Sequence, residues 1–178
     1  MRQLKRLVWA MALAGLVAGT GCRRQHPLTV ETVEEEGPPL VSVVHVADPR
    51  AAPQLLRGFY DIEHNSWRWT MGKFSVTLRP PAGAATKGAT LQLNLTMPEP
   101  VISRLRSVTL SASIRGVALD PETYTKPGDH VYRRDVPAAS LAAEAVTIDF
   151  ALDKYLAAGA VEQRELGVIV TQAGLIPK

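Results

Sequence analysis

The chain has 178 residues, of which 46% are hydrophobic and 21% are charged, a composition that excludes an intrinsically disordered protein. Once a targeting segment is removed, this length leaves room for one domain with a sizeable core. The net charge of +3 includes Arg2, Lys5 and Arg6, which lie in the segment that we expect to be removed. Of the 20 Lys and Arg residues, the 17 that remain balance 17 Asp and Glu residues, so charge gives no basis for binding nucleic acid.

The amino terminus is typical of a secretory signal. Residues 1–6 are basic, and residues 7–18 are apolar but fewer than the ~20 residues that a helix needs to cross a bilayer. Small residues at 19–21 lead into Cys22, the only cysteine. This order resembles the lipobox of bacterial lipoproteins, in which the cysteine becomes the first mature residue and carries lipid, although Gly19 replaces the usual leucine. The alternative, a secreted protein with Cys22 as a free thiol, is disfavoured because an exposed thiol is a liability in an oxidising compartment.

Lipidation at Cys22 would anchor the protein stably, since each buried CH₂ of an acyl chain contributes ~0.8 kcal/mol. Arg23, in place of aspartate, resembles the sorting signal of outer-membrane lipoproteins. The polar, acidic and proline-ended stretch that follows is typical of a tether. We therefore expect a signal peptide at 1–21, a lipid-anchored flexible tether at 22–39 and a folded domain at 40–178, held at the bacterial cell envelope on the periplasmic or surface face of the outer membrane.

The folded part begins with residues 40–46, whose β-branched, apolar run predicts a strand covered on both faces. His45 lies in this run, and no second metal ligand follows it at a convincing spacing. Residues 48–53 form a proline-rich loop. We expect no metal site and no cofactor.

Residues 58–78 form the stretch around which we expect the fold to be organised. Trp67 and Trp69 would share one face of a strand, with Arg68 on the other. Residues 69–72 suggest a strand end and a turn, and residues 74–78 alternate as in a half-buried strand. We take the tryptophan pair as the aromatic centre of a β-sandwich.

The remaining segments are short and alternate between apolar and polar residues. Strands are predicted at 90–97, 108–115, 131–136, 146–152 and 165–170, with a short helical turn at 101–106 and turns at Gly116, at 120–121 and at 126–130. Their near-even spacing and the absence of a βαβ rhythm predict an all-β, antiparallel β-sandwich, jelly-roll-like, as a single domain.

A family resemblance rests on three fragments: Gly58-Phe59-Tyr60 with Trp67-Arg68-Trp69-Thr70, the strand at 74–78, and Leu152-Asp153 followed by Arg164-Glu165-Leu166-Gly167-Val168. In this order they resemble a small β-sandwich module that accompanies bacterial glycosyltransferases and polysaccharide proteins and is similar to galactose-binding and carbohydrate-binding domains. The resemblance covers about residues 58–175. It implies a glycan-related role, here on a lipid anchor and without an attached catalytic domain.

The charged residues of these fragments suit a structural role. Arg68 and Arg164 are flanked by strong strand formers, and Glu165 or Asp153 could pair with one of them. A bidentate guanidinium–carboxylate pair would fix how two strands meet.

The candidate ligand-binding residues are Tyr60, Glu63, Asn65, Trp67 and Trp69. The two indoles could stack on sugar rings, but we expect at least one of them to pack in the core. The loop before them, which also holds His64, could hydrogen-bond sugar hydroxyls or be an ordinary polar turn.

No enzyme class is supported by a motif. The sequence lacks a G-x-S-x-G elbow, an H-E-x-x-H pair and a glycine-rich phosphate loop. Asp61 and Glu63 could be read as a glycosidase pair, but nothing sets their separation. We therefore expect a non-catalytic, lipid-anchored envelope protein that binds glycan or polysaccharide. The alternatives are an assembly lipoprotein that binds another envelope protein, for instance through a strand edge, and an unrecognised hydrolase.

Overall fold

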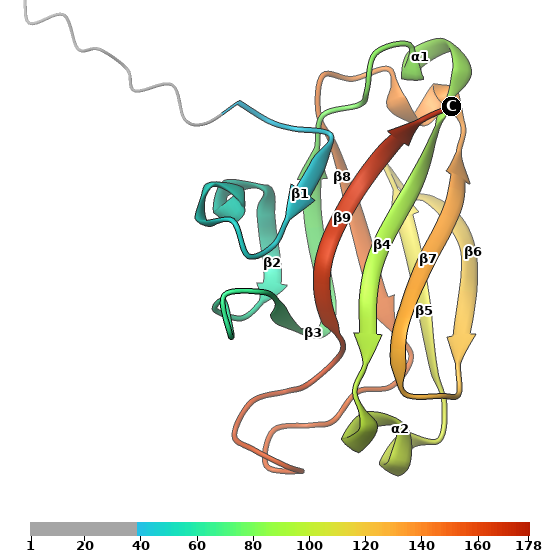
Figure 1. Cartoon of the computed structure of the whole chain (residues 1–178). Coiled ribbons are helices and arrows are strands. Elements are labelled where there is room, and N and C mark those ends of the chain that lie inside the picture. Colours follow the sequence, from blue (N-terminus) through green and yellow to red (C-terminus); the bar gives the residue numbers. More distant parts are fainter. Residues whose placement is uncertain (1–38) are drawn as a thin grey trace, which may run out of the picture. The chain divides into compact units, whose positions relative to one another are not determined.

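The computed structural model describes residues 39–178, so the expected signal peptide, the lipidation site Cys22 and all but the last residue of the tether lie outside the described residues. The described residues belong to one compact unit that is dominated by antiparallel strands (Figure 1). The strands are β1 (Val43–His45), β2 (Leu55–Phe59), β3 (Arg68–Leu78), β4 (Ala89–Met97), β5 (Val108–Ile114), β6 (Val117–Tyr124), β7 (Gly128–Val136), β8 (Val146–Leu152) and β9 (Ile169–Pro177). The helical turns are η1 (Pro49–Gln54), α1 (Ala84–Lys87), α2 (Glu99–Leu105) and η2 (Ala138–Leu141).

The strands form two layers. The front sheet has the order β1-β9-β4-β7, and the back sheet has the order β3-β8-β5-β6, with β2 added beside β3 (Figure 1). The first two residues of β3 pair with β9 and its last six pair with β8, so β3 joins the two sheets. In chain order, strands β3 to β9 are distributed between the two sheets as in a jelly roll. The predicted antiparallel β-sandwich is therefore confirmed.

The core lies between the two sheets, because buried residues alternate strictly with outward-facing residues along the central strands. Along β4 every second residue is buried, from Ala89 to Met97, and β5 and β8 repeat the pattern. The rings of Phe74 and Phe150 stack at a centroid distance of 4.9 Å in the middle of the back sheet. Each such side chain contributes roughly 1.5–3 kcal/mol when it is fully buried.

The tryptophan pair is not the aromatic centre of this core, so that prediction is wrong. Phe74 and Phe150 occupy the centre, whereas Trp69 is half-buried against the edge of the core and Trp67 lies just before β3 begins. The turn predicted at 69–72 is also absent, because β3 runs without interruption through Gly72. In this part of β3 the loop before β9 supplies backbone hydrogen bonds in place of a neighbouring strand. The Thr70 N–H, for example, donates to the Val168 carbonyl at 2.8 Å.

Three other sequence predictions need correction. Only Val43–His45 of the segment 40–46 forms a strand, and within it Val44 alone is buried. The last strand begins at Ile169 rather than at residue 165. Pro121 lies inside β6, which tolerates a proline because β6 is at an edge of its sheet and needs no donor on its free side.

The short helix predicted at 101–106 is present as α2. Within residues 39–178, no helix has the length and apolar character needed to cross a membrane.

Candidate functional site

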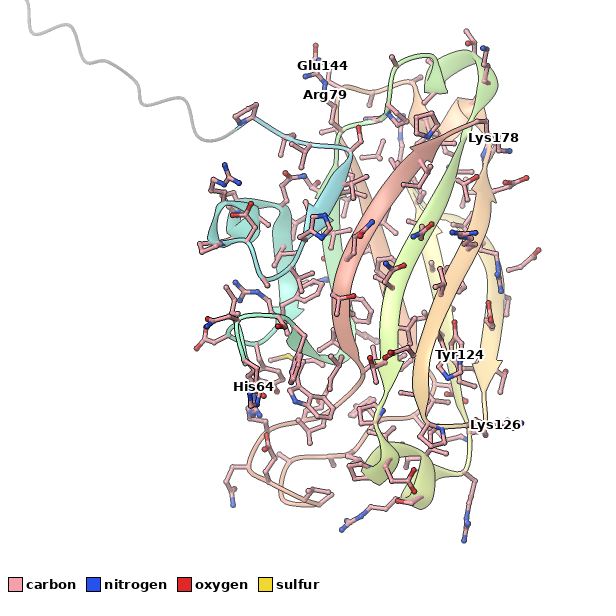
Figure 2. The ribbon with its side chains drawn as sticks, in the orientation of Figure 1. His64, Arg79, Tyr124, Lys126, Glu144 and Lys178 are labelled. Carbon is pink, nitrogen blue, oxygen red and sulfur yellow. The ribbon has the colours of Figure 1, made fainter. Side chains whose placement is uncertain are left out.

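The predicted ligand-binding loop lies at the end of the sandwich where β3 begins, and His64 marks it in Figure 2. The loop is a tight hairpin: the Glu63 N–H donates to the Trp67 carbonyl at 2.9 Å, and the Ser66 N–H donates to the Glu63 carbonyl at 3.1 Å. His64 and Asn65 at its tip have φ values of 51° and 54°. Two successive positive φ angles are typical of the hairpin turn in which asparagine is favoured, so Asn65 has a structural reason to be there.

Arg164, from the loop between β8 and β9, lies against this hairpin. Its guanidinium donates to the Glu63 carboxylate at 2.7 Å and to the carboxylate of Glu162. Its Cζ atom is 5.0 Å from the centre of the Tyr60 ring. The hydrogen bonds that Arg164 donates to Glu162 and Glu63 raise the pKa of Arg164 above its usual range, so the guanidinium stays charged.

Trp67 completes the group. Its indole lies 4.8 Å from the His64 ring, at an interplanar angle of 31°. Its Nε1–H is buried and has no hydrogen-bond partner among the described residues. We call this assembly the rim cluster, and its members are Tyr60, Glu63, His64, Trp67, Glu162 and Arg164.

The rim cluster remains accessible to a ligand. The side chains of Arg164, Glu63 and Glu162 keep 35%, 31% and 40% of their surface exposed. Aromatic rings, a guanidinium and two carboxylates therefore lie together on loops at one end of a rigid scaffold, an arrangement that suits binding rather than core packing.

The ion pairs expected between Arg68 or Arg164 and Glu165 or Asp153 are replaced by other contacts. Arg68 forms no ion pair with a carboxylate of residues 39–178; it donates to the carbonyls of Val46 at 2.7 Å and of Tyr60 at 2.8 Å. Glu165 accepts from the Gly72 N–H at 2.6 Å, and Asp153 accepts from the Thr109 N–H at 2.6 Å. These side chains tie loops to strand ends by satisfying backbone groups that would otherwise lack partners.

The structure thus brings together three of the five candidate residues: Tyr60, Glu63 and Trp67. Asn65 is exposed at the hairpin tip. Trp69 lies in β3 opposite Ile169 and accepts a hydrogen bond from the Tyr60 N–H on its carbonyl at 3.0 Å, but its side chain packs against the core. The sequence interpretation missed the contact between Glu63 and Arg164, which are 101 positions apart. No local pattern signals a contact of that range.

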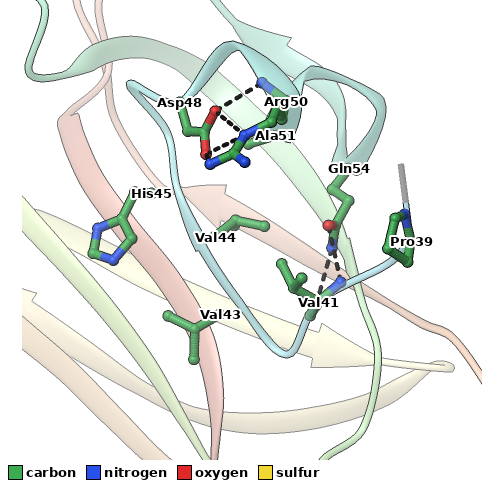
Figure 3. A pocket seen from close by; sticks show the side chains of 9 residues that line it. All are labelled: Pro39, Val41, Val43, Val44, His45, Asp48, Arg50, Ala51 and Gln54. Carbon is green, nitrogen blue, oxygen red and sulfur yellow. Dashed lines mark hydrogen bonds and ion pairs between the residues drawn. The ribbon is translucent and has the colours of Figure 1, made fainter. Parts of the chain in front are cut away.

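A hollow lies elsewhere in the domain, between β1 and η1 (Figure 3). This hollow of about 320 Å³ has an apolar floor that includes Val41, Val44 and Ala51. At one side, the buried Gln54 amide exchanges two hydrogen bonds with the Val41 backbone, each of 3.1 Å. At the other, hydrogen bonds from Arg50 lower the pKa of Asp48. The Gln54 amide and the Asp48 carboxylate therefore both have hydrogen-bond partners within the chain.

Groups of three or more His, Cys, Asp or Glu side chains that could hold a metal ion do not occur within residues 39–178.

No protein-family model matches the sequence, and no curated protein matches it. Among solved structures, the chain is similar to a family GH115 4-O-methyl-alpha-glucuronidase with specificity for decorated arabinogalactans, with a TM-score of 0.39 and 9% identity. The match covers 79% of this chain and 18% of that enzyme, so this chain corresponds to less than a fifth of the enzyme's length. A likeness of this size assigns neither a substrate nor an activity to this chain.

Proposed function

We propose that this protein is a non-catalytic, lipid-anchored protein of the bacterial cell envelope that binds glycan through the rim cluster. The observation that carries the proposal is the accessible pairing of aromatic rings with planar polar groups: Trp67 beside His64, and Arg164 beside Tyr60. Indole and phenol faces stack on the C–H faces of sugar rings, while guanidinium and carboxylate groups hydrogen-bond the hydroxyls at the ring edge.

The chemistry of the two carboxylates supports binding rather than hydrolysis. A glycosidase needs one carboxylic acid that gives a proton to the leaving oxygen and a second carboxylate that acts as base or nucleophile. Glu63 and Glu162 both accept hydrogen bonds from the guanidinium of Arg164. Their oxygens are thus engaged in orienting Arg164, which is a role in recognition.

The Trp67→Ala variant tests the site. We expect it to lose most of its retention in a polyacrylamide gel that contains the polysaccharide bound by the parent, with an affinity at least about tenfold lower, because stacking on the indole is removed. Tyr155→Ala is a matched control, since Tyr155 is an exposed aromatic residue outside the rim cluster. Equal retention of a folded Trp67→Ala variant and the parent would remove the rim cluster from the proposal.

The alternative, an assembly protein that pairs through a strand edge, receives support from β2. This strand is joined to β3 by an irregular register, and Leu56 within it is 51% exposed. Capture of one stoichiometric envelope protein by the parent, lost in the Leu56→Lys variant and without glycan retention, would favour this alternative.

A further inference from the structure

The outer face of the front sheet carries five planar polar groups, two from β4 and one from each of the other three strands. Asn94 of β4 is paired with Gln172 of β9, which is paired in turn with His45 of β1. On the other side, Gln92 of β4 is paired with Arg133 of β7. All five side chains are half-buried or exposed, and we call them the polar row.

A β-bulge in β9 is responsible for part of this row. The register passes from Asn94 opposite Gln172 to Leu95 opposite Val170, which leaves Thr171 without a counterpart. Val170 and Ala173, on either side, are both fully buried. Two consecutive polar residues, Thr171 and Gln172, therefore face outward together, which a regular strand does not allow. Bulges that re-aim side chains in this way are frequent beside binding sites.

The side chains of the row are held in place by one another. The Arg133 Nε–H donates to Gln92 Oε1 at 3.0 Å, and Gln92 Nε2 donates to Asn94 Oδ1 at 3.0 Å. Because arginine can only donate, this chain fixes the orientation of both amides. Within residues 39–178 no hydrogen bond uses the Asn94 amide nitrogen, the Gln172 side chain or the terminal nitrogens of Arg133. These groups are free to bind a ligand on the outer face.

The row opens onto a hollow of about 270 Å³ in the same sheet, whose lining includes Asn94, Thr96, Asp129 and Thr171. The Thr96 hydroxyl donates to Oδ1 of Asp129 at 2.5 Å, which leaves Oδ2 of Asp129 and the lone pairs of the Thr96 oxygen available as acceptors. The hollow thus extends the hydrogen-bonding surface beside the row.

We propose that the polar row binds a neutral, extended polysaccharide chain that crosses the front sheet from β1 to β7. Neighbouring strands are about 4.8 Å apart, a spacing close to the advance of one pyranose ring in an extended β-1,4-linked chain. Each ring would then meet the planar group or groups of one strand. An extended peptide advances about 3.4 Å per residue, which does not match the spacing of about 4.8 Å between neighbouring strands. This inference rests on the proposed function for the chemical class of the ligand, but it assigns a second surface, separate from the rim cluster.

Titration calorimetry of the full chain in detergent, with cello-oligosaccharides and manno-oligosaccharides of two to six rings, tests the proposal. We expect the affinity for at least one series to rise with each ring and to level off near four rings, because four strands contribute. The Asn94→Ala/Gln172→Ala variant should bind the six-ring ligand about tenfold more weakly. The Ser111→Ala/Ser113→Ala variant, on the outer face of the back sheet, should bind as the parent does.

The Asn94→Asp/Gln172→Glu variant gives a second measurement that preserves side-chain shape and removes the amide donors, and it should be weakened as well. Thermal melting confirms that each variant is folded. If Trp67→Ala abolishes binding of the six-ring ligands and the Asn94/Gln172 variants do not weaken it, the polar row is overturned while the rim cluster stands. If the reverse holds, the row is supported and the rim cluster is overturned. Binding of neither series to the parent chain would overturn the polar row.

Discussion

Tyr124 and Tyr132 lie on the adjacent edge strands β6 and β7 and are exposed by only 4% and 0%, but only one hydroxyl has a partner. The Tyr132 hydroxyl donates to the Asp120 carbonyl at 2.8 Å. The Tyr124 hydroxyl is buried and meets no acceptor or donor within residues 39–178. A buried, unpaired hydroxyl destabilises a fold by about 1–3 kcal/mol, so these two tyrosines should respond in opposite ways to the loss of that oxygen.

We predict that Tyr124→Phe raises the free energy of unfolding by about 1 kcal/mol, since it removes an unsatisfied hydroxyl and keeps the ring. Tyr132→Phe should lower it by a similar amount, about 1 kcal/mol, because the Asp120 carbonyl loses a donor. Urea denaturation of the two variants beside the parent measures both changes. A loss of stability in Tyr124→Phe would show that its hydroxyl has a partner, such as an ordered water.

Because the Tyr124 hydroxyl is buried, we also predict that the stability of the protein depends on pH in the alkaline range. Burial, with a smaller contribution from Glu122, raises the pKa of Tyr124 in the folded protein above the ordinary value of 10.0. Above pH ~10 the unfolded chain therefore releases this proton while the folded chain retains it, and stability falls as the pH rises. In Tyr124→Phe the free energy of unfolding should decline less steeply between pH 9 and 11 (about one unit either side of the ordinary tyrosine pKa). Identical slopes for parent and variant would contradict the assignment.

Gly72 shows why a glycine occurs inside a long strand. A Cβ atom at this position would lie 2.2 Å from Cδ1 of Tyr155, whose ring rests on the β3 backbone. We predict that Gly72→Ala lowers the free energy of unfolding by about 1–3 kcal/mol through this overlap. Tyr155→Ala should recover part of the loss in the double variant, so a double-mutant cycle by chemical denaturation should give a coupling energy above about 0.5 kcal/mol. Strict additivity would place the strain elsewhere.

At the scale of elements, the open edges of β6 and β7 face each other across the seam of the sandwich, and Arg134 covers them. Its guanidinium donates to the carbonyls of Asp120 at 2.6 Å and of Pro121 at 2.9 Å, and pairs with Glu122 at 3.0 Å. It also lies 4.4 Å from the centre of the Tyr132 ring. One side chain thus satisfies backbone carbonyls that would otherwise be available to another strand, and Pro121 removes a donor nearby.

We predict that Arg134→Ala lowers stability and promotes self-association, because it uncovers the edge of β6. Sedimentation velocity should show a concentration-dependent larger species that the parent lacks. Arg133→Ala, the neighbouring change on the outer face of β7, should remain at the parent's size and provides the matched control. A monomeric Arg134→Ala variant at all concentrations would mean that the seam stays closed without the guanidinium.

The strands that could be predicted from the sequence are those in which apolar and polar residues alternate because only one face of the strand is buried. The strand predicted at 90–97 is present as β4, and that at 146–152 as β8, because each has a core on one side and solvent on the other. The prediction failed where long-range contacts replace local ones. The segment 69–72 resembles a turn, yet it continues β3 because Glu165 and Val168 supply the hydrogen bonds that a neighbouring strand would otherwise give.

At the scale of the whole molecule, the candidate site depends on how the jelly roll brings distant loops to one end. Tyr60, Glu63 and Trp67 could be predicted as neighbours because they lie on one short loop. The position of Arg164 could not, because it follows from the packing of the loop after β8 against the start of β3. The polar row has the same origin: its members come from four strands, and the bulge at Thr171 appears in the sequence only as two consecutive polar residues, which do not by themselves indicate a bulge.

The attachment of the folded domain to a membrane is a separate prediction that rests on Cys22 and the segment before it. We predict that cells fed radiolabelled palmitate label the full chain, and that the parent protein partitions into the detergent phase of Triton X-114, since each buried CH₂ of the acyl chains contributes ~0.8 kcal/mol. Cys22→Ala removes the only thiol and should lose both label and partitioning, whereas Arg23→Ala should keep both. A label that survives in Cys22→Ala would contradict lipidation at this residue. An unlabelled parent whose Cys22 reacts with a thiol reagent would instead identify a secreted protein with a free cysteine.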